Sequence, residues 1–441
     1  MHIEKGNKKI ISAWCWYDWA NSVYPLVITT AVFPIYFGAV TEANGDKYIH
    51  FIGRDIVNSE FYSYLVSLSF LLVSFISPVL SGIADYAGRK RLFMQFFSTL
   101  GAISSASLFF FTGRENLWIG VVGSVIASIG FAGSLVFYNA FLPEIVEEKR
   151  MDQVSARGFT MGYIGSSILL ILCFIIIMKP TMFGIADLGP DKPNTALATR
   201  LSFLISGIWW FGFARIAFAG LPARTHNRPV ESRRILLHGY RQLGNVMKQL
   251  VQPAQRRILF FLAGFFFCAL GYMTVIYLAT LFGKEEIGMS ASELMIVVLV
   301  IQFVAIGGSH LFAWMSGKMG NIPALAISAL VWALVCCSTF FVTDKVGFYV
   351  VAFFVGTVMG GIQALARSTY AKLLPDTEDH ASYYSFYEFT EKVATATGTF
   401  SYGVIINLTG TMRNASLFLG AMFLVGVALL FAAHKARKVA K

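Results

Sequence analysis

The feature that most constrains this chain is a series of long apolar runs. A helix needs about 20 mostly apolar residues to cross the hydrocarbon core of a bilayer. We identify twelve such runs, at 15–39, 60–84, 92–112, 117–142, 157–178, 200–221, 257–282, 292–315, 322–342, 346–372, 384–408 and 414–433. They leave little sequence for a soluble domain, so we predict an all-α membrane protein with twelve transmembrane helices.

The charge distribution predicts the orientation of these helices. Only 13% of the residues are charged, against about 25% in soluble domains. The net charge of +11 would favour nucleic acid as a partner if the positive charge formed one patch. Instead, 24 of the 35 Lys/Arg residues fall on one predicted side and nine on the other, while Arg215 and Lys392 lie within helices. Because basic residues gather on the cytoplasmic side, we expect both termini in the cytoplasm and no nucleic-acid partner.

Six runs precede the longest loop and six follow it, which predicts an N-terminal bundle over 1–221 and a C-terminal bundle over 257–441. The two halves are also related in sequence at a constant offset of 232 residues. The matching positions are Tyr138, Leu142, Pro143 and Glu144 with Tyr370, Leu374, Pro375 and Asp376, and Asp85 and Gly88 with Gly317 and Gly320. Two pseudo-symmetric six-helix halves around a central cavity are typical of transporters.

The linker between the halves, 222–256, is basic. Eight Lys/Arg residues lie in it or directly after it, and Glu231 is its one acid. Apolar residues recur at helical spacing, at Leu236, Tyr240, Leu243, Met247 and Leu250. The pattern fits an amphipathic helix on the anionic inner leaflet, and it equally fits a basic linker with some helix.

A sharper motif follows the second run. Residues 82–91 read Gly-Ile-Ala-Asp-Tyr-Ala-Gly-Arg-Lys-Arg, which resembles the helix 2–3 signature of the major facilitator superfamily. The resemblance implies a cytoplasmic latch in which Asp85 faces the start of the eleventh helix, with Gly88 forming the turn and Arg89 and Glu144 nearby. The counterpart at 316–321 has no acid, so we expect a weaker latch in the second half.

Other segments indicate a particular branch of that superfamily. They are Asp-Trp-Ala-Asn-Ser at 18–22, Phe-Pro-Ile-Tyr-Phe at 33–37 and Gly-Gly-Ile-Gln-Ala-Leu-Ala-Arg-Ser at 360–368. They resemble the autophagy-related vacuolar effluxer family and its bacterial relatives. The resemblance implies a twelve-helix facilitator, here in a bacterial cytoplasmic membrane, and for the fungal members it implies release of amino acids from the vacuole. Glu388, Glu391 and Arg215 depart from the pattern we expect of this family.

Ionisable residues inside a bilayer are costly, so each needs a partner, water or a function. Asp18 is an interfacial cap or latch acid, or it couples transport to protons. Glu388 and Lys392 are four residues apart on one helix face, and Glu391 adds a second acid. These three form a self-neutralising cluster, or one acid titrates during transport. His310 is either structural or a further coupling group.

The candidate substrate-binding residues are polar side chains on the first, fourth, seventh and tenth helices. They are Asn21, Asn139, Tyr277, Gln363 and Arg367. Gln363 and Arg367 share one helix face because they are four residues apart. Arg367 either binds a substrate carboxylate or pairs with an acid of the eleventh helix, unless it extends to the membrane surface. Tyr277 either contacts substrate or only packs.

These observations predict a secondary transporter that moves a small polar solute, an amino acid or a related metabolite, by alternating access. A proton or solute gradient would supply the energy, because the chain contains no Walker-type nucleotide-binding sequence. A channel or lipid scramblase is the alternative. An enzyme is not expected, since neither His-Glu-x-x-His nor Gly-x-Ser-x-Gly occurs. We expect no cofactor or metal, and a monomer.

Overall fold

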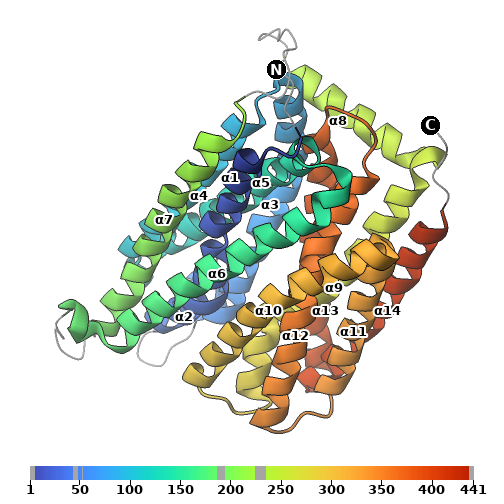
Figure 1. Ribbon diagram of the computed structural model, residues 1–441. Coiled ribbons are helices and arrows are strands. Elements are labelled where there is room, and N and C mark those ends of the chain that lie inside the picture. Colours follow the sequence, from blue (N-terminus) through green and yellow to red (C-terminus); the bar gives the residue numbers. More distant parts are fainter. Residues whose placement is uncertain (1–4, 43–47, 52, 186–193, 224–234, 437–441) are drawn as a thin grey trace.

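The structure is a computed structural model that describes residues 5–42, 48–51, 53–185, 194–223 and 235–436. This part of the chain is almost entirely helical (Figure 1). Its helices are α1 (Lys8–Asn21), the π-helix η1 (Tyr24–Val32), α2 (Phe33–Thr41), α3 (Asn58–Ala87), α4 (Lys90–Ser107), α5 (Leu117–Ile145), α6 (Met151–Met178), α7 (Asn194–Gly220), α8 (Ile235–Val251), α9 (Arg256–Glu285), α10 (Ala291–Met319), α11 (Asn321–Thr339), α12 (Lys345–Leu373), α13 (His380–Thr409) and α14 (Met412–Lys435). Strands β1 (Tyr48–Phe51) and β2 (Arg54–Val57) form a small antiparallel hairpin in which Tyr48 pairs with Val57.

Each of the twelve apolar runs falls on one helical segment, counting α1, η1 and α2 as a single bent segment. Ten of these segments are both long and apolar enough to cross a membrane by composition alone. The other two, α3 and α13, are 30 residues long, which at about 1.5 Å per residue also spans a bilayer. Helix α13 contains Glu388, Glu391 and Lys392, and these charges make it more polar than its neighbours.

The first segment changes its winding at two prolines. Proline has no backbone N–H and disturbs the hydrogen-bond ladder of a helix, and Pro25 and Pro34 bracket most of η1. Thr29 and Thr30 donate side-chain hydrogen bonds to the carbonyls of Tyr24 and Pro25, at 3.4 and 2.7 Å. These hydroxyls supply donors to two carbonyls near the first proline, where the backbone ladder has lost a donor.

The helices form two groups, coloured blue to green and yellow to red in Figure 1. Within the first, α1 packs on α6 and α7, and α4 packs on α5 and α7. Within the second, α14 packs on α9 and α11, and α10 packs on α12. The groups meet where α3 and α5 contact α13, and where α6 contacts α10 and α12.

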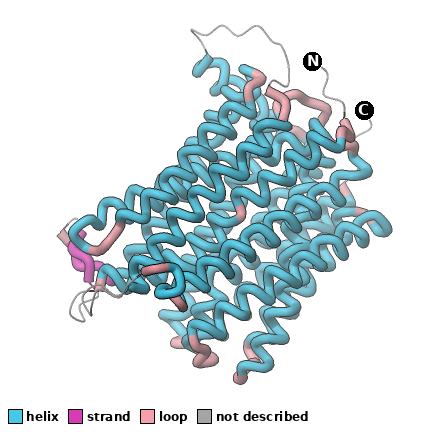
Figure 2. The backbone as a smooth tube through the Cα atoms, turned by 60° about the vertical axis from the view of Figure 1, so that its left-hand side comes forward, coloured by secondary structure: helices cyan, strands magenta, loops and turns pink. Residues whose placement is uncertain are grey.

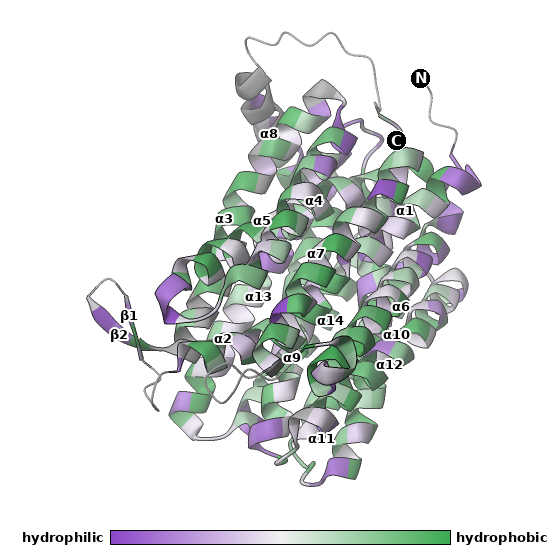
Figure 3. Cartoon of the chain, turned by 90° about the vertical axis from the view of Figure 1, so that its left-hand side faces the viewer, coloured by the Kyte–Doolittle hydropathy of each residue, from purple (hydrophilic) through white to green (hydrophobic). Residues whose placement is uncertain are grey.

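Two ends of the molecule can be distinguished. We call the end at which α1 begins and α14 ends the terminal end, and the opposite end, where the β1–β2 hairpin projects, the hairpin end (Figure 2). Hydrophilic residues gather toward these ends, whereas the middles of the helices are mostly hydrophobic (Figure 3). Helix α8 lies at the terminal end, where it packs on α3 and α13. Its polar Gln249 accepts a 2.9 Å hydrogen bond from Tyr383.

The start of the linker, 224–234, lies outside the described residues, as does most of its basic charge. The described part is helical, as the spacing predicts, and its exposed side includes Arg241 and Lys248. Buried Val246 and Leu250 face the protein, whereas Met247 is exposed. Contact with the lipid surface is not tested by this arrangement and stays a prediction.

At the hairpin end, Glu286 connects the end of α9 to the start of α14. Its carboxylate accepts hydrogen bonds from the Met412 backbone N–H at 2.9 Å and from Arg413 at 3.0 Å, and Arg413 also donates to the carbonyls of Phe340 and Val342. Burial alone would raise the pKa of Glu286, but these donors and the charge of Arg413 hold it below its ordinary value. A carboxylate at the start of α14 also suits the positive end of that helix.

Candidate functional site

A cavity with a volume of about 220 Å³ lies between the two helix groups. Its walls come from α1, η1, α5 and α6 on one side and from α9, α10, α12 and α13 on the other. It extends from Asp18 and Arg367 to Thr30 and Thr280, which lie nearer the hairpin end on their helices. All five predicted substrate-binding residues line this cavity.

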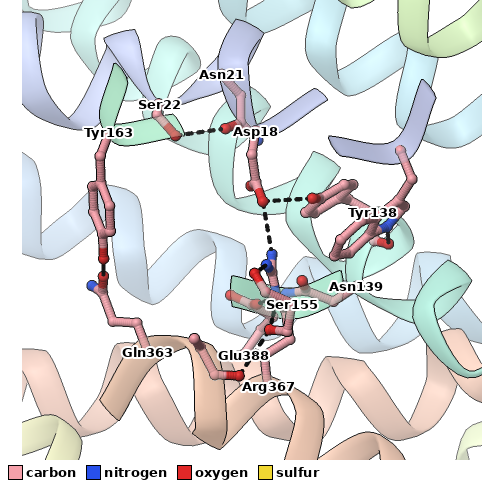
Figure 4. A network of polar contacts seen from close by, with 12 residues as sticks. Asp18, Asn21, Ser22, Tyr138, Asn139, Ser155, Tyr163, Gln363, Arg367 and Glu388 are labelled. Carbon is pink, nitrogen blue, oxygen red and sulfur yellow. Dashed lines mark hydrogen bonds and ion pairs between the residues drawn. The ribbon is translucent and has the colours of Figure 1, made fainter. Parts of the chain in front are cut away.

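An ion pair joins the two groups at the terminal side of the cavity. Arg367 of α12 donates to the Asp18 carboxylate of α1 at 3.1 Å, although 349 residues separate them (Figure 4). Tyr138 of α5 donates to the same carboxylate oxygen at 2.6 Å. Both charges are deeply buried, with 4% of Asp18 and 3% of Arg367 exposed. Asp18 is therefore not an interfacial cap but joins the groups as a latch acid would, and its coupling to protons stays a prediction.

Two further guanidinium donors of Arg367 bind Ser155 of α6. They reach the hydroxyl of Ser155 at 3.0 Å and its carbonyl at 2.8 Å. The rings of Trp14 and Phe159 cover the guanidinium, with centroids 4.7 and 4.1 Å from Cζ, an arrangement that favours a cation. The sequence-based alternatives for Arg367, an acid of the eleventh helix or extension to the surface, are both wrong in this structure. Its acid is in the first helix.

Small residues on α6 allow α1 to pack closely against α6 beside this ion pair. Gly158 faces the Asp18–Arg367 pair, Gly162 faces Ser22 and Gly165 faces Trp19. A Cβ at residue 158 would lie 2.9 Å from an Arg367 nitrogen and against the Asp18 carboxylate. Glycines that let helices pack closely are common in membrane proteins. Here the close approach positions a charged pair.

We therefore expect Gly158→Ala to displace the carboxylate or the guanidinium and to cost about 1–3 kcal/mol of stability, the usual range for overpacking. Thermal unfolding of the purified protein measures the effect. Gly212→Ala in α7 is the matched control, because a Cβ there meets nothing within 4 Å. Equal stability of the two variants would show that the contact at Gly158 tolerates a methyl group.

A second charged cluster lies on α13. Lys392 donates to Glu391 at 2.7 Å and lies 3.5 Å from Glu388. Each acid also has a partner on another helix, since Asn139 of α5 donates to Glu388 at 2.9 Å and Tyr272 of α9 donates to Glu391 at 2.6 Å. The three charges do neutralise one another in part. Their partners also connect α13 to both helix groups.

The other predicted cavity residues occupy separate walls. Gln363 accepts a 2.6 Å hydrogen bond from Tyr163 of α6, a further link between the groups. Asn21 is buried, and its amide oxygen accepts a long hydrogen bond of 3.4 Å from Ser22. Tyr277 is half-buried and lines the cavity from α9. His310 does not line the cavity. Its ring is exposed and contacts the Thr160 hydroxyl at 3.1 Å.

The terminal end is closed by a contact that we call the Asp85 latch, formed by Asp85, Lys90 and Glu144 against the start of α13. The Asp85 carboxylate accepts the backbone N–H groups of Ala381 and Ser382, at 3.2 and 2.6 Å. These N–H groups belong to the positive end of a helix, where a carboxylate is stabilised. Gly88, with φ of +61°, forms the turn that follows Asp85.

The base of this latch is Lys90, and the prediction of Arg89 is wrong. Lys90 is fully buried, pairs with Asp85 at 3.1 Å and with Glu144, and donates to the Glu378 carbonyl at 3.2 Å. Arg89 is exposed. The turn at Gly88 directs the first residue of α4 inward and its predecessor outward, so neighbouring bases have different environments.

A second contact, which we call the Asp152 latch, closes the same end. Asp152 of α6 accepts hydrogen bonds from Ser316 and Asn321, both at 2.6 Å, and from Lys372 of α12 at 2.7 Å. The expectation of a weaker latch in the second half rested on the missing acid at 316–321. The acid of this latch is Asp152, which belongs to the first group. A comparison of the two loop sequences could not identify it, because it lies in neither loop.

No group of three or more His, Cys, Asp or Glu side chains in the described part of the chain is arranged to hold a metal ion. The polar side chains that line the cavity instead include paired acids and bases together with hydroxyls. Such a set can bind a small polar molecule or exchange protons.

The chain is similar to known proteins in sequence and in fold. A family model described as "Vacuole effluxer Atg22 like" matches residues 6–441. The MFS-type transporter YxiO of Bacillus subtilis is 32% identical over 95% of this chain and 93% of its own. The human organic anion transporter MFSD10 superposes with a TM-score of 0.70 over 97% of this chain and 100% of its own, at 12% identity. The E. coli fucose:proton symporter FucP superposes with a TM-score of 0.67 over 96% and 97%, at 16% identity.

Proposed function

The chain belongs to the family of Atg22-like vacuole effluxers and is an MFS-type transporter, and from that premise we propose that it moves a small polar solute by alternating access. The fold is that of the major facilitator superfamily, so the predictions of fold class and of a multi-pass membrane protein are confirmed. The cavity lies between the halves, which is where transporters of this architecture bind substrate. An amino acid or a related metabolite is our candidate class.

The observation that carries the proposal is that the charged contacts between the groups lie on one side of the cavity. The Asp18–Arg367 pair, the Asp85 latch and the Asp152 latch all join the first group to the second toward the terminal end. A structure closed at one end and hollow toward the other is one of the two states that alternating access requires. Opening the terminal end must break these contacts.

We further propose that protons couple to this opening. Separation of the groups would leave Asp18 and Arg367 without each other in a largely apolar environment, which is costly for both charges. A proton taken up by Asp18 would reduce that cost. Glu388, Glu391 and Lys392 form the second candidate coupling group, because Glu388 also bonds across the groups to Asn139.

The remaining proposals concern placement. We propose two bundles over 1–221 and 257–441 joined by the linker 222–256, and a monomer in a bacterial cytoplasmic membrane. The terminal end would be cytoplasmic, as the positive-inside rule requires, so the state described here would face outward. The basic linker would rest on the anionic inner leaflet.

Counterflow in proteoliposomes is the direct test of transport. Ligands are first found by thermal stabilisation of the purified protein against amino acids, peptides, sugars and drugs, since binding to the folded state raises its apparent stability. We expect a stabilising ligand to show saturable uptake that is stimulated by unlabelled ligand on the other side. Non-saturating flux without such stimulation would instead support a channel or scramblase.

A further inference from the structure

Three buried acceptor atoms of cavity-lining side chains have no hydrogen bond from the described residues; one is Oε1 of Gln302, and the other two belong to side chains that are bonded to each other. These two are the amide oxygen of Asn139 and Oε2 of Glu388, and the latter has Lys392 Nζ only as an ion-pair partner at 3.5 Å. Both side chains are at least nine-tenths buried, with 5% and 3% exposed. Both line the cavity. Leaving a buried acceptor without a donor costs about 1–3 kcal/mol, and more when the group is charged.

The orientation of this pair is fixed by the bond that it does make. Asn139 donates through its amide nitrogen to Oε1 of Glu388 at 2.9 Å. An ionised carboxylate can only accept, so the Asn139 oxygen must point away from that bond. The two unsatisfied oxygens therefore belong to side chains that are already joined.

The charge around these oxygens is negative. Five ionisable acids and bases line the cavity, and they are Asp18, Glu388, Glu391, Arg367 and Lys392. Arg367 is already engaged by Asp18, and Lys392 lies closer to Glu391 than to Glu388, at 2.7 against 3.5 Å. Three carboxylates against two cations leave a formal charge of −1, and the compensation is weakest at Glu388.

We propose that the Asn139–Glu388 pair binds an ammonium group, and that the transported solute is an amine with an apolar body. An ammonium has three donors and no acceptor, which matches acceptors on two joined side chains and a carboxylate that Lys392 compensates only from 3.5 Å. The rest of the cavity wall is largely apolar, with Leu26, Phe131 and Leu135 on one side and Ile276, Val297 and Met359 on the other. A substrate carboxylate has no free cation to meet, because both Arg367 and Lys392 are paired. This inference rests on the proposed transport function, and among small polar solutes it favours amines that lack a carboxylate over amino acids.

The test compares ligands that differ only in the polar group. Thermal stabilisation of the unmodified full chain is measured with butylamine, hexylamine and 2-phenylethylamine, and with the alcohols and carboxylates of the same chain lengths. We expect only the amines to stabilise, and the longer ones to do so at lower concentration. Equal stabilisation by the alcohols or carboxylates, or none by any amine at millimolar concentration, would overturn the proposal.

A substitution then locates the site. Glu388→Gln is expected to weaken the apparent affinity for 2-phenylethylamine at least tenfold, whereas Glu285→Gln, which removes an exposed acid outside the cavity, should leave it unchanged. Equal affinity in both variants would place the ammonium elsewhere and overturn the assignment to Glu388.

Counterflow of radiolabelled 2-phenylethylamine separates this inference from the transport function. If amines stabilise selectively but show no stimulated exchange, the ammonium site is supported and transport is contradicted. If a solute that has no amino group shows stimulated exchange, transport is supported and the ammonium site is contradicted.

Discussion

Replacing Asp18 with asparagine is expected to destabilise the protein by about 3–5 kcal/mol, the usual cost of leaving a buried charge without its partner. Arg367 is 3% exposed and keeps its charge at any accessible pH. Without the carboxylate, its partners among the described residues are the two oxygens of Ser155 and the aromatic rings around it. We expect the variant to lose solute counterflow as well, because the pair joins the two helix groups.

The opposite substitution should be milder. Arg367→Met leaves Asp18 buried, but a carboxylate can escape that cost by taking up a proton, and Tyr138 still bonds to it at 2.6 Å. The double variant Asp18→Asn/Arg367→Met removes both charges, so it should recover much of the stability lost in Asp18→Asn while remaining inactive. Thermal unfolding of the four proteins gives the coupling energy of the pair.

Glu285→Gln again serves as the control for loss of an acid at the surface. An Asp18→Asn variant as stable as this control would mean that the Asp18–Arg367 contact contributes nothing to folding. In that case the proposal that opening must break a costly pair would lose its physical basis.

Sequence reasoning reached the fold because each span must satisfy its own backbone inside the membrane. The twelve apolar runs therefore correspond to helices one by one. The bend near Pro25 was also predictable, since proline removes a donor from the ladder. The hairpin β1–β2 was not predicted, because it is short and lies between two strong helical signals.

The side chains of the site were partly predictable, whereas most of their partners were not. Asn21, Asn139, Tyr277, Gln363 and Arg367 were chosen for polarity on an apolar helix, and the cavity contains them all. The contacts themselves join positions hundreds of residues apart, and helical periodicity gives no information about such pairs.

Several residues of the site were not predicted, and the sequence contained a clue to only some of them. Tyr138 belongs to the repeated segment that matches Tyr370 at an offset of 232, so its importance had a signal although its bond to Asp18 did not. Asp152 had none, because it follows a charged loop and resembles a surface acid. Lys90 could be distinguished from Arg89 only by the geometry of the turn at Gly88.

The Asp85 latch and the Asp152 latch should both favour closure of the terminal end. Asp85→Asn removes the charge that binds two backbone N–H groups and Lys90, and Asp152→Asn removes the charge that binds Lys372. Hydrogen bonds to charged groups contribute about 1.5–3 kcal/mol each. Loss of one such contribution corresponds to a shift of about tenfold or more in favour of the state open at the terminal end.

Cysteine labelling measures that shift. Ala313 lies in a small buried cluster with Ala156 and Ala364, where α6, α10 and α12 meet. We expect Ala313→Cys, in a chain whose five native cysteines are replaced by serine, to react slowly with a membrane-impermeant maleimide. Either latch variant should raise the rate about tenfold, and the double variant should raise it further, because the latches share no side chain. Rates equal to that of the Glu285→Gln control would mean that neither latch holds the closed state, whereas an effect of Asp85→Asn alone would restore the asymmetry that the missing acid at 316–321 suggested.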